Sequence, residues 1–267
     1  MIMKSFKRIF AIFWRQMLLL KGNPFRPLNL FYFSALELFL WGVLTLYLDR
    51  IVGSDFNFVA LILGTVIMSS FMSRVVFGVS ASFLEDVWTR NFINLFSSPL
   101  SLHEYILGFV AVSVVESLIS LGFIAMLAWF LLSYSIFSFG FFLIPFAVAL
   151  FVFGLAVGIV ATAVVLRFGP SAEMVVWSIP PLLAPFSAVF YPLSALPPFL
   201  QKIAFFIPAT HVFEGMRAVV RAGTVDTREL IVGFALAVIY CAVAYLFLYR
   251  SYRAVLRRGT FARFATE

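Results

Sequence analysis

The chain consists of long apolar runs that are separated by short polar breaks. A helix needs about 20 apolar residues to cross the hydrocarbon core of a bilayer. Membrane-spanning strands would alternate apolar and polar positions over about ten residues, and no stretch of this chain does so. We therefore expect an all-α membrane protein with a single transmembrane domain over residues 1–267. Six runs are long enough to form transmembrane helices, near 28–48, 56–81, 105–132, 141–166, 171–193 and 229–249.

Residues 4–21 have a different, amphipathic pattern. The basic Lys4, Arg8 and Arg15 fall on one helical face, and the apolar Phe6, Phe10, Phe13 and Met17 recur at helical spacing on the other. Such a pattern is typical of a helix that lies in the membrane surface. We expect an interfacial helix on the inner leaflet. Two interpretations stay open: a topology anchor, or an anchor that also forms part of a docking surface for a cytoplasmic partner.

Basic residues gather near the two ends of the chain. Cytoplasmic loops of membrane proteins carry an excess of Lys and Arg. We therefore expect both termini in the cytoplasm, which requires an even number of crossings and agrees with six predicted spans. The basic residues before the first span are Lys4, Lys7, Arg8, Arg15, Lys21 and Arg26, and those after the last are Arg250, Arg253, Arg257, Arg258 and Arg263.

Composition agrees with lipid as the outer solvent. The chain is 63% hydrophobic and 12% charged, whereas soluble domains are about 45–50% apolar. Its 12 acidic and 19 basic residues are too few to cover a soluble domain of this size. The net charge of +7 sits at the chain ends, which favours lipid headgroups over nucleic acid. Cys241 is the one cysteine of the sequence, so an internal disulfide is excluded.

The longest polar passage on the predicted inner side is residues 83–105, which read FLEDVWTRNFINLFSSPLSLHEY. Trp88, Phe92 and Leu95 would share one face of a short helix parallel to the membrane. Ser101 and Glu104 have the spacing of a capping box that starts the third span. The short helix has two interpretations: an interfacial connector, or a tip that inserts into a groove of a partner.

Two acidic residues are predicted near the middle of the membrane. Glu37 lies in the first predicted span and Glu116 in the third. A carboxylate at this depth costs several kcal/mol unless it is paired or protonated. The glutamates either line a substrate path or are neutral and hydrogen-bonded as structural contacts; the candidate donors are Ser34, Ser113, Ser117 and Ser120. Arg74 is expected to extend to the inner headgroups, and Gly154 with Gly158 to permit close helix packing.

Motifs of enzymes are missing from the sequence. No GxxxxGK[ST] phosphate loop is present, so we expect no nucleotide hydrolysis by that route. His103 and His211 lack the HExxH spacing of a zinc site, and we expect an interfacial and a helix-terminal histidine, respectively. No GxSxG nucleophile motif is present either. We expect neither bond chemistry nor a metal site.

Prolines interrupt the apolar stretch before the last span. Pro192, Pro197, Pro198 and Pro208 cannot occur inside one straight helix. Backbone groups freed by such breaks must be buried against protein or line a wet cavity. We expect a re-entrant segment over 194–226, with a short helix at 199–206 and Thr210 capping a last helix that carries Glu214 and Arg217. A channel vestibule, a transporter gate and a binding site for an amphipathic molecule all fit this pattern.

The same stretch carries a family resemblance. Residues 187–201 read SAVFYPLSALPPFLQ and residues 208–217 read PATHVFEGMR. These strings resemble the outer segment of ABC type-2 exporter permeases, the membrane subunits of ATP-binding-cassette exporters. The layout of an amphipathic first helix and six spans is also similar. Two departures are Ala188, where the family usually has Gly, and residues 85–90, where a more acidic run ending in Gly-Thr is common.

The resemblance implies a set of partners and roles. The chain would be half of a transport pore in the plasma (inner) membrane, surrounded by lipid and paired with a second copy. Separate nucleotide-binding subunits would hold ATP and Mg, so this chain would need no cofactor of its own. Residues 83–100 would form the coupling helix and 4–21 the connecting helix. The implied coupling residues are Glu85, Asp86, Trp88 and Arg90; the pathway candidates are Glu37 and Glu116; the outer gate candidates are Pro192, Pro197, Pro198, Pro208, Glu214 and Arg217.

The expected function is therefore export of a hydrophobic or amphipathic compound, such as a drug-like molecule or a lipid, by a transport subunit that is not itself an enzyme. Two alternatives remain. A polysaccharide or lipid-linked glycan exporter of the same family would require a channel lined with aromatic residues at positions where they stack on sugars. A passive channel or a membrane scaffold would need no ATPase partner at all.

Overall fold

The computed structural model describes residues 2–22, 25–52, 58–91, 94–95, 98–224 and 226–258. Phe92 and Arg263, named above, lie outside the described residues. All regular structure within the described ranges is helical. The helices are α1 (Ile2–Gly22), α2 (Phe25–Val52), α3 (Phe58–Trp88), α5 (Leu102–Leu132), η1 (Ile136–Phe142), α6 (Leu143–Phe168), η2 (Pro170–Ala172), α7 (Glu173–Phe186), η3 (Leu193–Ala195), α8 (Pro198–Phe205), α9 (Pro208–Ala222) and α10 (Thr227–Arg258).

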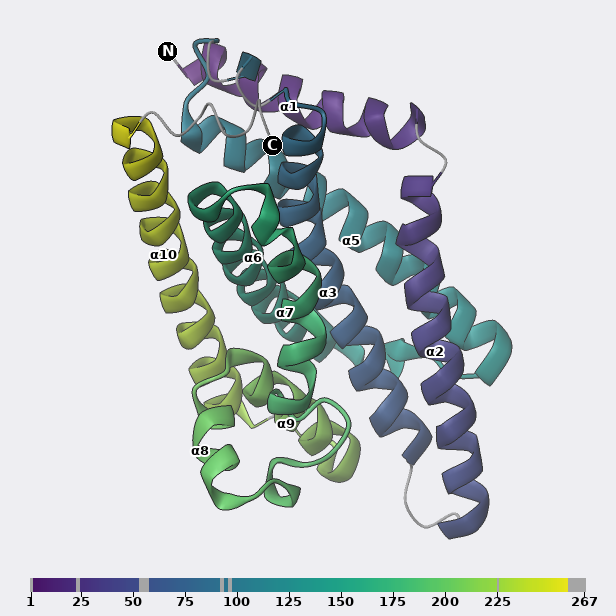
Figure 1. The fold of residues 1–267 in the computed structure, drawn as a ribbon. Coiled ribbons are helices and arrows are strands. Elements are labelled where there is room, and N and C mark those ends of the chain that lie inside the picture. Colours follow the sequence, from purple (N-terminus) through teal and green to yellow (C-terminus); the bar gives the residue numbers. More distant parts are fainter. Residues whose placement is uncertain are drawn as a thin grey trace.

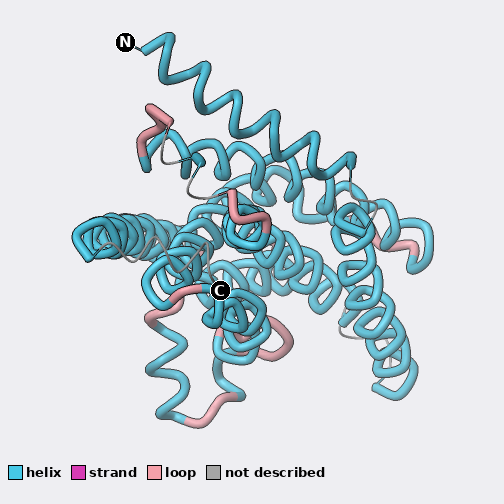
Figure 2. Tube along the Cα trace, turned by 45° about the horizontal axis from the view of Figure 1, so that its top comes forward, coloured by secondary structure: helices cyan, strands magenta, loops and turns pink. Residues whose placement is uncertain are grey.

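The predicted all-α membrane fold is confirmed. Five helical stretches are long and apolar enough to cross a membrane, and the bent pair of α8 and α9 raises the candidates to 6. The helices α2, α3, α5, α6, α7 and α10 run along the bundle in alternating directions (Figure 1). The helix α1 lies across the end of the bundle at which α10 ends, as the views of Figures 1 and 2 agree. This arrangement fits an even number of crossings.

Two predicted boundaries are wrong. The second span does not end near residue 81, because α3 continues to Trp88. The fifth span, expected over 171–193, has a helix of only 14 residues, α7. Its three internal prolines remove backbone donors, and the chain then turns through Ala188, whose φ of 54° is left-handed. The remainder of the predicted span therefore belongs to the re-entrant segment.

Helices α3 and α6 pack closely at the centre of the bundle. A Cβ atom added at Gly154 would lie 2.9 Å from Val75 Cβ, and one at Gly158 would lie 2.8 Å from the Val76 carbonyl oxygen. Real Cβ atoms do not approach so closely, so these glycines permit the observed packing. The predicted role of this glycine pair is confirmed. Around this contact lies an apolar core to which Ile67, Met72 and Phe153 contribute.

The re-entrant segment turns at its prolines, as predicted. Pro192 precedes η3, Pro197 and Pro198 start α8, and Pro208 is the first residue of α9. The helices α8 and α9 meet at an angle of 101°. The predicted cap at Thr210 is wrong, because α9 starts two residues earlier with proline, whose fixed φ suits a first helical turn.

Candidate transport groove and the contacts that frame it

A groove of about 870 Å³ lies between α2, α3 and α7, and α5 adds one residue to its wall. Its polar lining consists mainly of serines and charged side chains from α2, α3 and α5. Phe33, Trp41, Phe77 and Trp177 contribute aromatic rings from three helices. Both pathway candidates, Glu37 and Glu116, line this groove. The structure therefore brings together two acids that the sequence could only place at a similar depth.

Glu37 projects from the middle of α2 toward α3. Its carboxylate accepts a hydrogen bond from the Ser70 hydroxyl. Ser70 was not among the predicted donors. Those serines bind elsewhere: Ser34 shares a hydrogen bond with Ser120 at 3.2 Å, and Ser113 donates to the Val75 carbonyl oxygen at 3.1 Å. They connect α2, α3 and α5 without contacting Glu37, so the predicted serine contacts of this glutamate are wrong.

Arg74 lies near the middle of α3, one turn beyond Ser70. Its guanidinium lines the groove and donates to the Leu30 carbonyl oxygen at 3.2 Å. It also interacts electrostatically with Glu116. An acid of α5 and a base of α3 therefore offset each other's charge at the wall of the groove.

The groove runs from the middle of the bundle to the end covered by α1. Along α3 its lining residues extend from Ser69 to Trp88, a distance of about 29 Å at helical rise. At the opposite end, the Trp41 ring stacks on Phe190 of the re-entrant segment, with centroids 3.9 Å apart. The re-entrant segment therefore bounds the groove on the side away from α1.

Arg217 holds the turn of the re-entrant segment that bounds the groove. Its side chain is buried with 1% exposure and donates to two backbone carbonyl oxygens of the turn before Pro192: those of Ala188 and of Val189, the latter at 3.0 Å. Arg217 also contacts Glu214 at 2.8 Å. Glu214 in turn accepts from the Leu193 backbone N–H at 2.7 Å. Two of the gate candidates thus hold the turn through its backbone.

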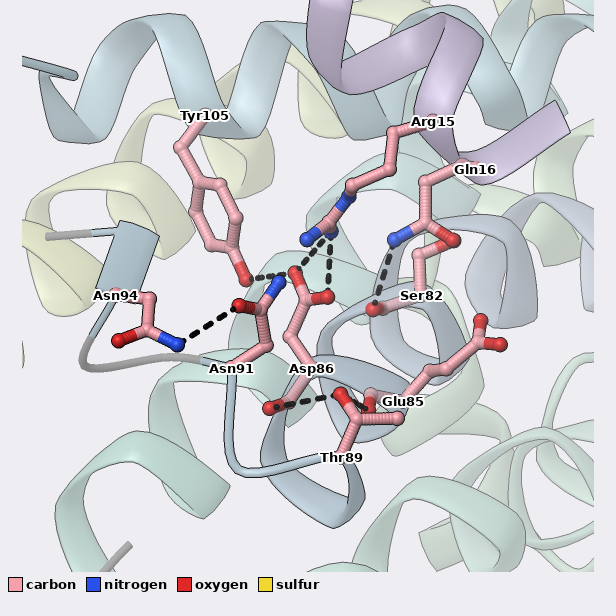
Figure 3. A network of polar contacts seen from close by, with 9 residues as sticks. All are labelled: Arg15, Gln16, Ser82, Glu85, Asp86, Thr89, Asn91, Asn94 and Tyr105. Carbon is pink, nitrogen blue, oxygen red and sulfur yellow. Dashed lines mark hydrogen bonds and ion pairs between the residues drawn. The ribbon is translucent and has the colours of Figure 1, made fainter. Parts of the chain in front are cut away.

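A second framework of contacts ties α1 to the ends of α3 and α5 that it covers (Figure 3). Asp86, with 1% exposure, accepts from Arg15 at 2.6 Å and from the Tyr105 hydroxyl at 2.7 Å. Gln16 donates to the Ser82 carbonyl oxygen at 3.4 Å. Farther along α1, Arg8 pairs with Glu104 at 3.4 Å. Two arginines of the predicted basic face, Arg8 and Arg15, therefore pair with carboxylates that are buried.

With this geometry established, the comparison with known families is decisive. A family model described as ABC-2 type transporter matches residues 7–220. The chain belongs to the ABC-2 type transporter family. No curated protein matches it.

As an ABC-2 type transporter, this chain is a multi-pass membrane permease subunit and not the ATPase. The family in general works with an ATP-binding partner subunit. The match covers α1 from Lys7 through most of α9, so the groove, the contacts of Arg15 with Asp86 and the Arg217 contacts all lie within the matched part of the chain.

The four coupling candidates have different surroundings in this ABC-2 type transporter. Asp86 is buried under α1, and Glu85 lines the groove. Trp88 is half exposed, and its indole N–H donates to Glu173 of α7 at 2.7 Å. Arg90 is exposed and left-handed, with a φ of 56°. The prediction that Trp88 and Leu95 share one face of a short helix is wrong, because α3 ends at Trp88 and the chain then turns.

His211 lies at a helix terminus, as predicted, and His103 also lies in the first turn of a helix. His103 is in the first turn of α5, beside Tyr245 of α10. His211 is in the first turn of α9 and contacts two acceptors, Glu229 at 2.5 Å and the Phe205 carbonyl oxygen at 2.7 Å. A ring that donates from both nitrogens satisfies both contacts. His211 therefore connects α8, α9 and α10.

Several contacting residues were missed by sequence reasoning. Ser70 and Tyr105 are ordinary residues of apolar runs, and nothing in the sequence marks them as partners of Glu37 and Asp86. Phe190 lies 149 positions from Trp41, so their stacking depends on the fold. Glu173 comes three residues after Pro170, where a helix is expected to start. An acidic residue in a first helical turn was the one signal that could have indicated this site.

Proposed function

We propose that this chain is the permease subunit of an ATP-driven exporter that moves a hydrophobic or amphipathic compound out across the plasma membrane. The observation that carries the proposal is the groove, which combines aromatic walls with charged and hydroxyl groups at mid-depth. Such a lining suits a molecule with one apolar and one polar part. The chain works with a second copy of itself and with separate ATPase subunits.

The direction of transport is proposed from the position of the opening. The groove reaches the end of the bundle that carries α1 and its basic residues, and this end faces the cytoplasm by the positive-inside rule. At the other end, Trp41, Phe190 and the Arg217 contacts close it. Substrate therefore enters from the inner side and leaves when the re-entrant segment moves.

Coupling to the ATPase is proposed for the inner end of α3. Trp88 and Arg90 are exposed there, and Asp86 joins the same helix end to α1. A force on this surface would move α1, α3 and α5 together, because Asp86 of α3 contacts Arg15 of α1 and Tyr105 of α5. Closure of the ATPase pair would tilt these helices as one body.

Co-purification tests the proposal. A tagged full-length chain in mild detergent should bring down an ATPase subunit, and ATP hydrolysis should rise when the complex is reconstituted. The double variant Trp88→Ala with Glu85→Ala should lower the recovered ATPase while the chain stays inserted. Glu173→Gln is the matched control, because it changes the internal partner of Trp88 and leaves Arg90 in place. A complex without any ATPase would favour a passive channel or scaffold.

A glycan exporter is the second candidate, on a specific observation. Ser69, Ser70 and Ser73 line the groove near aromatic rings, and hydroxyl donors with ring faces are what a sugar needs. Stimulation of the ATPase by a lipid-linked oligosaccharide, with no response to amphipathic small molecules, would select this candidate.

A further inference from the structure

We propose that the groove selects an organic cation, with Glu37 as its counter-ion and the rings of Phe33 and Trp41 beside the charge. This rests on the proposed function, in which the groove is the substrate path. The three residues follow one another at intervals of four along α2 and all line the groove. Residues at this spacing share one helical face, so the carboxylate lies between two aromatic rings.

The charges on the groove wall favour a cation. Among the described lining residues, Glu37, Glu85 and Glu116 are acidic and Arg74 is the one base. The Arg74 guanidinium has partners of its own on three sides: Glu116, the Leu30 carbonyl oxygen and the Phe77 ring, whose centroid lies 5.9 Å away. The positive charge of the wall is therefore committed to contacts other than Glu37.

Glu37 meets a neutral donor instead of a base. The Ser70 hydroxyl donates one hydrogen bond to its carboxylate, and a carboxylate offers about four acceptor positions. A carboxylate near the middle of a membrane costs several kcal/mol unless it is protonated or a positive charge offsets it. A bound organic cation supplies that charge, and an anion of the same shape would add to the repulsion.

The aromatic residues of the groove add a second contribution to the binding of a cation. A cation within about 6 Å of a ring centroid is attracted by the ring face, most strongly by tryptophan. Trp41 is held in place by its stacking on Phe190, with an interplanar angle of 12°. Trp177 and Phe77 line the groove from α7 and α3 and provide apolar surface for the rest of the molecule. The expected ligand is a monocation with a large aromatic or aliphatic body.

Two dyes of nearly equal shape and opposite charge test the inference. Rhodamine 123 is a cation, and fluorescein methyl ester has the same xanthene core with a negative charge. Binding is measured by fluorescence anisotropy on the full-length chain in nanodiscs of phosphatidylcholine, with empty nanodiscs subtracted. The wild-type chain should bind the cation at least about tenfold more tightly, which corresponds to about 1.4 kcal/mol.

Glu37→Gln should weaken rhodamine 123 binding about tenfold and narrow the preference between the dyes. Asp49→Asn is the matched control, because it removes a carboxylate from the same helix outside the groove, and it should bind as wild type does. Equal affinity of the wild-type chain for the two dyes would overturn the inference without any variant. So would unchanged binding by Glu37→Gln. Recovery of the co-purified ATPase is measured for the same variants. A chain that recovers the ATPase but shows no cation preference contradicts the cation inference and leaves the proposed function intact.

Discussion

Arg15 and Asp86 are 71 positions apart in the sequence, yet the guanidinium of one donates to the carboxylate of the other at 2.6 Å. The contact joins α1, which lies across the bundle, to the last turn of α3 (Figure 3). Tyr105 donates to the same carboxylate from α5. One buried acid therefore determines how three helices sit together at the surface proposed to meet the ATPase.

Asp86→Ala should destabilise the protein strongly. The change leaves Arg15 and the Tyr105 hydroxyl without their acceptor in a buried site, and breaking a buried ion pair costs about 3 kcal/mol or more. The midpoint of thermal unfolding in detergent measures the effect. Asp49→Asn serves as the control, and the role assigned to Asp86 is wrong if both variants unfold at the same temperature.

Arg217→Lys should loosen the re-entrant turn while the rest of the bundle keeps its order. A lysine keeps the charge but lacks the planar fork with which Arg217 reaches Glu214 and the carbonyl oxygens of Ala188 and Val189. Hydrogen–deuterium exchange should rise over residues 187–193 and stay unchanged in α6. An unaltered exchange rate at the turn would show that Arg217 does not hold it.

Ala188→Gly should stabilise the turn slightly. Ala188 has a φ of 54°, and this left-handed conformation costs an L-residue about 1 kcal/mol. The departure from glycine at this position therefore has a physical consequence. The variant should unfold at a higher temperature, and Ala188→Val, whose branched side chain tolerates this conformation poorly, at a lower one. A lower midpoint for the glycine variant would contradict the left-handed backbone at this position.

Gly158→Ala should separate α3 from α6. The added Cβ would lie 2.8 Å from the Val76 carbonyl oxygen, a backbone atom that moves only with its helix. Such overpacking costs about 1–3 kcal/mol. Gly122→Ala is the matched control, because a Cβ atom added there would meet nothing within 4 Å. Equal unfolding temperatures for the two variants would argue against close packing at Gly158.

Local features of this chain could be predicted from its sequence. The capping box of Ser101 and Glu104 forms as its spacing indicated, because all of its atoms belong to one helical turn. The breaks at Pro192, Pro197, Pro198 and Pro208 were equally clear, since proline limits its own backbone. Five of the six predicted membrane spans follow from the lengths of the apolar runs, and a long apolar helix of the structure corresponds to each of these five.

Features that depend on distant partners could not be predicted. The second span was expected to end near residue 81, yet α3 continues to Trp88, and Arg15 of α1 and Tyr105 of α5 bind Asp86 in its last turn. The Glu214 and Arg217 pair was visible at helical spacing, but the carbonyl oxygens that Arg217 binds lie in a turn 28 and 29 positions away.

The central claim is that the groove between α2, α3 and α7 is a substrate path, and that ATP hydrolysis in a partner subunit drives transport through it. Labelling of Ser73→Cys with a membrane-impermeant maleimide tests it, in a chain whose Cys241 is replaced by serine and which is reconstituted with its ATPase in inside-out vesicles. Ser73 lines the groove, whereas Ser113→Cys provides a fully buried reference on α5. We predict fast labelling of Ser73→Cys without nucleotide and protection after trapping with ATP and vanadate. A rate that matches Ser113→Cys and does not change with nucleotide would contradict the claim.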